Sequence, residues 1–262
     1  MHCVIIGASR GLGAALAEAC LKNRDFSVIG IGRTAPEDIP DLGGWAETGR
    51  FQYFQADITT PNGSAILHSV SSLLPDQPAC VIMNAAVIES DLAEDGTFLI
   101  DAYDRVNDAG IAGLGRVIDA FGEHLTRFKG VFVGISSLSA LAPPFLDKRI
   151  AYPASKAFMT MALRSLRLVW KDRVRIMTVF PGYIGSSRPV RGFTWLAPTY
   201  RTVARKIVRK IQGKRVPHTL LIPLPVGLIY RLFSILPDGL YFWAAGKIEA
   251  HARSDGERGR RQ

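Results

Sequence analysis

Short apolar runs alternate along the chain with longer segments in which apolar residues recur every three or four positions. The short runs predict strands over residues 2–6, 26–31, 51–55, 79–83, 130–135, 174–180 and 219–222. The longer segments predict helices over residues 12–22, 63–73, 99–107, 111–127, 152–171 and 202–211. Alternation of this kind is typical of a parallel sheet, and runs such as CVII and VFVGI are apolar throughout, as in strands covered on both faces. We therefore expect an α/β fold with a doubly wound, seven-stranded parallel sheet and helices on both faces.

The length of 262 residues, of which 48% are hydrophobic, suits one large core. We expect one main domain over residues 1–224, an apolar helical extension over 225–250 and a basic tail without stable structure over 251–262. Within the extension, residues 226–236 and 238–248 predict two short helices on either side of Pro237.

The net charge of +9 is concentrated in two segments. Residues 201–215 carry seven Lys and Arg and no acid, and residues 251–262 carry four Arg against two acids, so the remainder is neutral. The remainder of the chain is neutral, and the basic segment 201–215 has no interleaved aromatic residues; both features argue against nucleic-acid binding. The 201–215 pattern predicts an amphipathic helix with one packed and one solvated face.

The chain has three cysteines, Cys3, Cys20 and Cys80. Their odd number and wide spacing exclude a disulfide framework and a zinc site, and we expect no metal. Each lies in an apolar segment, so we expect small buried side chains. No basic leader precedes the first apolar run and no apolar stretch reaches the ~18–20 residues that span a bilayer, so we expect a cytoplasmic protein.

A glycine-rich turn follows the first strand, in the sequence CVIIGASRGLG. A strand, a turn with three glycines and then a helix form a binding site for a pyrophosphate, because glycine permits close approach and the helix N-terminus offers free N–H groups. The spacing G-x-x-x-G-x-G resembles that of the short-chain dehydrogenase/reductase family, although Ile6 stands where the family usually has Thr. The resemblance implies a Rossmann-type fold.

The identity of the nicotinamide cofactor is suggested by the residue after the second strand. An NAD site places an acid there, but this chain has Arg33, and Arg10 lies within the glycine turn. Two guanidinium groups suit the 2′-phosphate of NADP. We expect NADP(H) in preference to NAD(H).

A second motif, IAYPASKA, places Tyr152 and Lys156 on one face of a helix. A lysine ammonium on the same helix face as a tyrosine favours the phenolate form, which lowers the pKa of the tyrosine and makes it a better acid–base catalyst. The resemblance assigns Tyr152 as proton donor, Lys156 as its partner and Asn107, followed by Gly110 in an N-x-x-G pattern, as the residue that holds a water of the proton relay. The catalytic serine is Ser137 if the I-S-S motif decides, and Ser139, thirteen residues before the tyrosine, is the alternative.

The resemblance covers roughly residues 1–222 and also implies the cofactor contacts. These are the turn and strand-end residues Gly7, Ser9, Arg10, Gly11, Leu12, Gly13, Arg33, Asp57, Ile58, Asn84 and Ala85, together with Tyr152, Lys156, Pro181, Gly182, Ile184 and Ser186. It implies an NADPH-dependent reductase of a ketone or aldehyde, working reversibly as an alcohol dehydrogenase. The alternative is a non-catalytic NADP-binding sensor or scaffold, a class that usually lacks the Tyr or the Lys.

Residues beyond these motifs bear on substrate and partners. Arg188 and Arg191 could recognise an anionic substrate or be exposed charges, whereas Phe193, Trp195 and Leu196 suit an apolar pocket and a lipophilic substrate. The apolar extension covers the pocket or a dimer partner, or else residues 226–262 dock peripherally on the inner face of a membrane. A homodimer or homotetramer is expected from the family.

Overall fold

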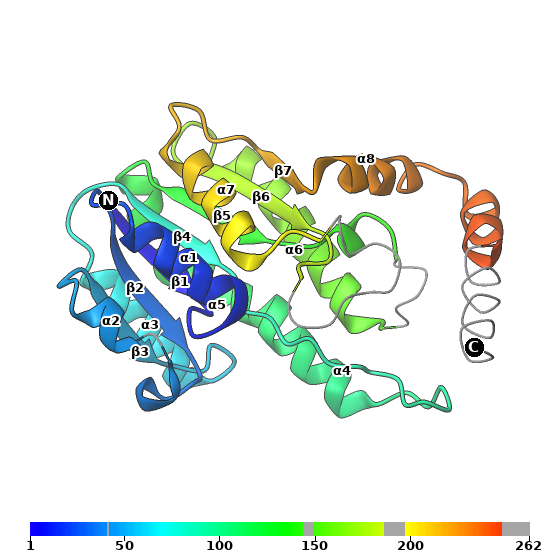
Figure 1. Ribbon diagram of the computed structural model, residues 1–262, viewed down its shortest axis with the longest axis horizontal. Helices are drawn as coiled ribbons and strands as arrows, with labels where there is room; N and C mark the ends of the chain where they lie inside the picture. The colour runs from blue at the N-terminus through cyan, green and yellow to red at the C-terminus, as the bar shows by residue number, and fades with distance from the viewer. Residues whose placement is uncertain (41, 144–148, 186–196, 248–262) are drawn as a thin grey trace, which may run out of the picture.

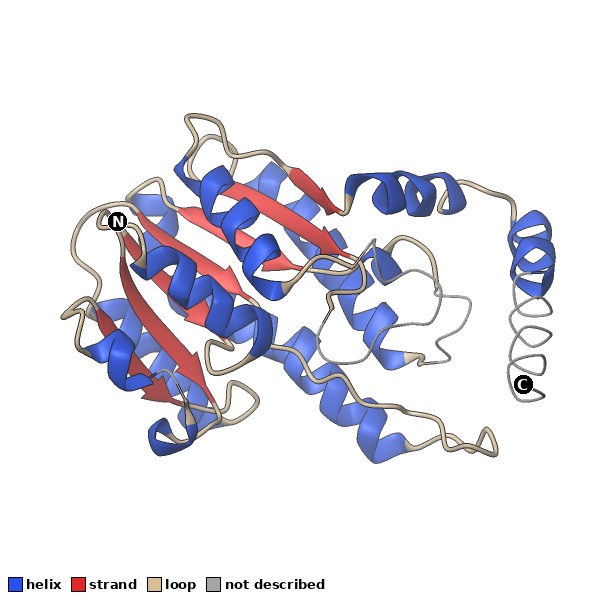
Figure 2. Cartoon of the chain, in the orientation of Figure 1, coloured by secondary structure: helices blue, strands red, loops and turns tan. Residues whose placement is uncertain are grey.

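The computed structural model describes residues 1–40, 42–143, 149–185 and 197–247. Its centre is a seven-stranded parallel sheet in the order β3-β2-β1-β4-β5-β6-β7 (Figure 2). The strands are β1 (His2–Ile6), β2 (Ser27–Gly32), β3 (Phe51–Gln55), β4 (Ala79–Met83), β5 (Val131–Ile135), β6 (Arg175–Pro181) and β7 (Thr219–Ile222). The predicted parallel sheet is thus confirmed, and each strand lies within one residue of its predicted bounds at either end.

Helices cover both faces of the sheet (Figure 1). They are α1 (Gly11–Leu21), α2 (Leu42–Ala46), α3 (Pro61–Ser72), α4 (Ile100–Asn107), α5 (Gly113–Arg127), α6 (Ala151–Val169), α7 (Tyr200–Gln212) and α8 (Leu224–Phe233), with a last helical segment over residues 238–247. One apolar cluster joins the sheet to α1 and α7, and a second joins it to α3, α5 and α6. The central strands β1, β4 and β5 are covered by helices on both faces, which is why they are apolar throughout, whereas the edge strand β3 carries exposed Gln52 and Gln55.

The predicted helix over 111–127 begins differently in the structure. A π-helical turn, Asp108–Ala112, follows α4 directly and leads into α5. Close packing occurs at this turn, because a Cβ on Gly110 would lie 2.8 Å from the Cβ of Ser155 in α6. The periodic sequence could not show the turn, since it lies where two helices meet.

The cysteines behave as expected, since all three are fully buried. Within the described ranges, none of the helices combines the length and the apolar character that crossing a bilayer requires. The division into a main domain, an extension and a tail stays a prediction, because residues 248–262 lie outside the described part of the chain.

Helix α8 starts two residues earlier than predicted, with Pro225 in its first turn. It extends from the end of β7 beyond the body of the molecule (Figure 1). Tyr241, in the last helical segment, donates a hydrogen bond to the carbonyl of Pro143, and its ring meets that of Phe233 edge to face. These contacts hold the two C-terminal helices at an angle to each other.

Candidate active site

A cleft of about 1610 Å³ opens at the carboxyl ends of the strands. It is lined by residues that follow β1, β2, β3, β4, β5 and β6 and by two side chains of α8. The volume exceeds the ~300–1,000 Å³ usual for a drug-sized ligand, so a dinucleotide and a substrate can lie in it together. Open α/β sheets bind their ligands at this edge.

The glycine turn forms one end of the cleft. Gly7 has a φ of +86°, and a Cβ there would lie 2.7 Å from the Cα of Ala85. The side-chain amide of Asn84 donates to the carbonyl of Gly7 at 2.8 Å. The turn is therefore braced by the residues that follow β4. Gly13 does not line the cleft; a Cβ on it would lie 1.8 Å from the Gly7 oxygen, so its part is to let α1 pack against the turn.

Most of the other predicted cofactor residues also line the cleft. Those that line the cleft are Gly7, Ser9, Arg10, Gly11, Leu12, Arg33, Asp57, Ile58, Asn84, Ala85, Tyr152, Lys156, Pro181, Gly182 and Ile184. Arg10 and Arg33 are exposed, and no acid follows β2 directly. The Asp57 carboxylate accepts hydrogen bonds from the backbone N–H and hydroxyl of Thr59, at 2.9 and 2.8 Å. Ser186 lies outside the described residues, as do the lid residues Arg188, Arg191, Phe193, Trp195 and Leu196.

Tyr152 and Lys156 project from the first two turns of α6 into the opposite end of the cleft. Lys156 is 2% exposed, and its Nζ donates to the carbonyl of Ile135, the last residue of β5, at 2.8 Å. Burial lowers the pKa of Lys156 from 10.5 to about 8. The ammonium lies 5.8 Å from the centre of the Tyr152 ring.

Three serines follow β5, and the structure gives them different partners. The Ser136 hydroxyl is buried and bonds the Lys156 carbonyl at 3.1 Å and the Thr160 hydroxyl at 2.8 Å. Ser137 and Ser139 both line the cleft. The Ser137 oxygen accepts from the backbone N–H of Ser139 at 3.1 Å and from its hydroxyl at 2.8 Å.

Asn107 is not brought into the cleft wall. It is the last residue of α4, directly before the π-helical turn, and it is absent from the described residues that line the cleft. Its predicted part in a proton relay stays a prediction.

Sequence reasoning did not find Arg149. Its guanidinium lies 5.0 Å from the centre of the Tyr152 ring, and the side chain lines the cleft. Two cationic side chains, those of Arg149 and Lys156, therefore lie near the Tyr152 ring. Arg149 lies in an irregular segment whose local sequence has no periodicity that indicates a site.

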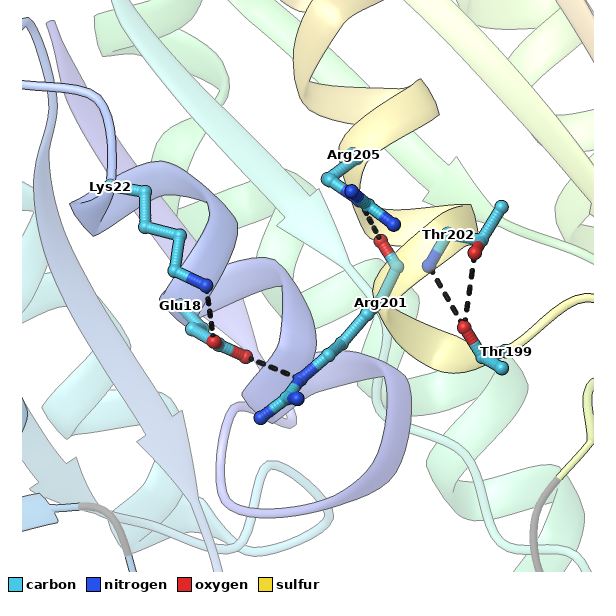
Figure 3. A network of polar contacts seen from close by, with 6 residues as sticks. All are labelled: Glu18, Lys22, Thr199, Arg201, Thr202 and Arg205. Atoms are coloured by element: carbon cyan, nitrogen blue, oxygen red, sulfur yellow. Dashed lines mark hydrogen bonds and ion pairs between the residues drawn. The ribbon is translucent and has the colours of Figure 1, made fainter.

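Tyr200, the first residue of α7, was also missed, and it contacts a residue far from it in the sequence. Its ring is 3.6 Å from the position that a Cβ on Gly11 would take, so it stands against the glycine turn. Figure 3 shows how α7 is held there: Arg201 reaches Glu18 of α1 at 3.1 Å, and Lys22 reaches the same carboxylate at 2.6 Å. The hydrogen bond and the charge of Lys22, with a smaller contribution from Arg201, hold the pKa of Glu18 below its ordinary value.

A buried carboxylate positions the start of α6. Asp91 is fully buried and accepts from the backbone N–H of Ile150 at 2.9 and 3.1 Å and from that of Ala151 at 2.6 Å. It caps the helix N-terminus, where a negative charge is favourable. Tyr152 is the next residue, so Asp91 sets where its ring enters the cleft.

A family model described as short chain dehydrogenase matches residues 1–191. The NADP-dependent mannitol dehydrogenase of Aureobasidium melanogenum is 31% identical over 86 residues. That match spans about a third of either protein, 32% of this chain and 32% of the relative.

Solved structures share the fold over nearly the whole chain. A short-chain dehydrogenase from Streptomyces avermitilis has a TM-score of 0.72 at 19% identity, with 97% of each chain covered. A short chain dehydrogenase from Burkholderia cenocepacia J2315, solved in complex with NADP, has a TM-score of 0.72 at 21% identity, covering 92% of this chain and 95% of that one. At these identities the likeness is one of fold.

Proposed function

The chain belongs to the short-chain dehydrogenase/reductase family of NAD(P)-dependent oxidoreductases that act on CH–OH groups, and from this premise we propose that it is an NADPH-dependent reductase of a ketone or aldehyde. The observation that carries the proposal is the convergence of Ser137, Tyr152 and Lys156 at one end of a cleft whose other end is the glycine turn. A sensor or scaffold would have no need of a buried lysine beside the tyrosine.

Tyr152 is the proton donor in this proposal. Its phenolate, formed when the proton leaves, is stabilised by the Lys156 ammonium at 5.8 Å and the Arg149 guanidinium at 5.0 Å from the ring centre. Both cations act in a partly enclosed site, where electrostatic interactions are stronger than in water. With a pKa of about 8, Lys156 is still largely protonated at neutral pH.

Ser137 is favoured over Ser139 as the group that holds the substrate oxygen. The Ser137 oxygen accepts two hydrogen bonds from Ser139, so its own proton is left to donate to a carbonyl. The Ser139 proton is already used in that contact. Ser139 thus serves as a positioning residue, which orients the Ser137 hydroxyl and polarises it.

The dinucleotide fits the residues at the other end of the cleft. The glycine turn and the N-terminus of α1 suit a pyrophosphate, because a Cβ at Gly7 would collide with the backbone of Ala85 and the turn has room only for glycine. Arg10 and Arg33 suit the extra phosphate of NADPH, with no acid directly after β2 to repel it. When bound, the nicotinamide supplies the hydride.

The experiment that tests the proposal compares wild type with Tyr152→Phe. NADPH consumption is screened against ketones and aldehydes of increasing chain length, and NADPH affinity is measured separately by fluorescence titration. Loss of the general acid is expected to lower kcat by about 10²–10⁴-fold, with NADPH affinity nearly unchanged. Wild-type turnover in the Phe variant would show that Tyr152 is not the proton donor.

A further inference from the structure

Helix α8 has two faces with different surroundings. Gly227 is buried, and a Cβ on it would lie 2.6 Å from the Leu221 side chain in β7. Val226 and Tyr230 line the active-site cleft. The opposite face is apolar and exposed over the whole helix and just beyond it. Its side chains are Leu224, Leu228, Ile229, Leu232 and Ile235, each between 50% and 76% exposed.

The outer face of α8 carries no charge. Arg231 is the helix's single charged residue, and its guanidinium lies over the ring of Phe180 in β6, 5.7 Å from the ring centre. That contact directs the charge toward the body of the protein. An uncharged, continuous apolar stripe of this length is unusual on a surface that faces only water.

Exposed apolar side chains also occur in the last helical segment. Leu240, Phe242 and Trp243 are exposed there, while Tyr241 between them anchors the segment to Pro143. Aromatic side chains of this kind are enriched where lipid headgroups meet the acyl chains.

The charge near this helix favours a lipid surface as the partner over a second copy of this chain. Residues 201–237 contain eight Lys and Arg and no Asp or Glu, and the seven cations of residues 201–215 are exposed. Helix α7, β7 and α8 follow one another along the chain, with α7 over the sheet beside α1 and β7 at the edge of the sheet from which α8 extends (Figure 1). A second copy would bring a like-charged segment to this edge in a symmetric contact, whereas anionic headgroups complement it.

We propose that the outer face of α8, together with Leu240, Phe242 and Trp243, docks on an anionic lipid surface, and that the cleft draws a lipophilic carbonyl substrate from it. The second part rests on the proposed function. The geometry joins the two, since α8 presents one face to the cleft and the other to the outside. A membrane-dissolved substrate would then pass along a single helix to reach Tyr152.

Flotation of the purified full-length chain with vesicles tests the docking. The vesicles are phosphatidylcholine alone, and phosphatidylcholine mixed with an equal amount of phosphatidylglycerol. Wild type is expected to float with the anionic vesicles, less at high salt because charges are then screened. The double variant Leu228→Glu/Leu232→Glu is expected to lose about a hundredfold in partitioning. The control is Leu73→Glu, at a leucine of similar exposure beyond α3, and it is expected to float like wild type.

Circular dichroism and NADPH titration verify that each variant is folded. Absence of wild-type flotation on both vesicles, or undiminished flotation of the double variant, would overturn the proposal. A wild type that stays with the soluble fraction and dimerises by light scattering, with a monomeric double variant, would identify α8 as an interface between copies and would equally overturn it.

The substrate part is tested with a long-chain methyl ketone dissolved in the vesicles and a short-chain one in buffer. The double variant is expected to raise KM for the vesicle-dissolved ketone about tenfold or more and to leave the soluble one unchanged. An equal effect on both ketones would refute delivery from the lipid surface. Tyr152→Phe is expected to lower kcat by about 10²–10⁴-fold and still float, so failure of the reductase proposal is distinguishable from failure of docking.

Discussion

Removing the Asp91 carboxylate tests how the catalytic helix is positioned. Asp91 is fully buried and accepts the backbone N–H groups of Ile150 and Ala151, so Asp91→Ala leaves one buried donor, that of Ala151, and one partly buried donor, that of Ile150, unpaired. Each unpaired donor costs about 1–3 kcal/mol. The expected loss in the free energy of unfolding is about 2–5 kcal/mol. A loss of roughly 3 kcal/mol lowers Tm by about 10 °C in a chain of this size.

The assay is urea unfolding with NADPH titration and turnover of any carbonyl substrate found. Because Asp91 holds the residue before Tyr152, kcat is expected to fall while NADPH affinity at the distant glycine turn stays. Thr60→Ala is a matched control, since the Thr60 hydroxyl caps α3 by accepting from the Gly63 N–H at 3.0 Å and donates to the Asp57 carbonyl at 2.9 Å. It is expected to lose about 1 kcal/mol and no kcat. If Asp91→Ala is no worse than Thr60→Ala in stability and in kcat, the reasoning is wrong.

Three further changes have definite expected outcomes. Because burial puts the pKa of Lys156 at about 8, below the ordinary 10.5, the charged side chain destabilises the fold fully below pH 8 and ceases to do so above pH 10.5. Lys156→Met should therefore gain about 2 kcal/mol at pH 7, roughly 3 from the pKa difference less about 1 for the lost bond to Ile135. Near pH 11, where only the lost bond to Ile135 remains, it should instead lose about 1 kcal/mol, and it should lose turnover; urea unfolding at both pH values measures this, and an equal change in stability at the two would contradict it. Gly13→Ala should unfold the glycine turn, since its Cβ would overlap the Gly7 oxygen, whereas Gly115→Ala, in open space on α5, should raise Tm by adding about 0.5–1 kcal/mol; a stable Gly13→Ala would refute the packing argument. Arg33→Ala should raise the Kd for NADPH about 10–100-fold by losing charge-assisted hydrogen bonds and leave that for NADH unchanged in calorimetry; equal effects on both would remove Arg33 from the 2′-phosphate site.

Local patterns were sufficient to predict the sheet. A parallel strand covered on both faces must be apolar throughout, so β1, β4 and β5 are recognisable without any tertiary information. The glycine turn and the Tyr152–Lys156 pair are likewise short-range features. A turn allows only certain residues, and two residues four apart share a helix face wherever the helix lies.

The sequence by itself therefore determined the fold class, the place of the glycine turn after β1 and the tyrosine–lysine pair on one helix. Only the tertiary structure decided which side chains surround them: Arg149 beside Tyr152, Tyr200 against Gly11 and Asp91 beneath the start of α6. Tyr200 and Asp91 are each more than fifty residues from the residue they contact, and Arg149 lies in an irregular segment. Secondary structure follows from short-range periodicity, whereas these contacts depend on how layers of helix pack on the sheet, which no local pattern encodes.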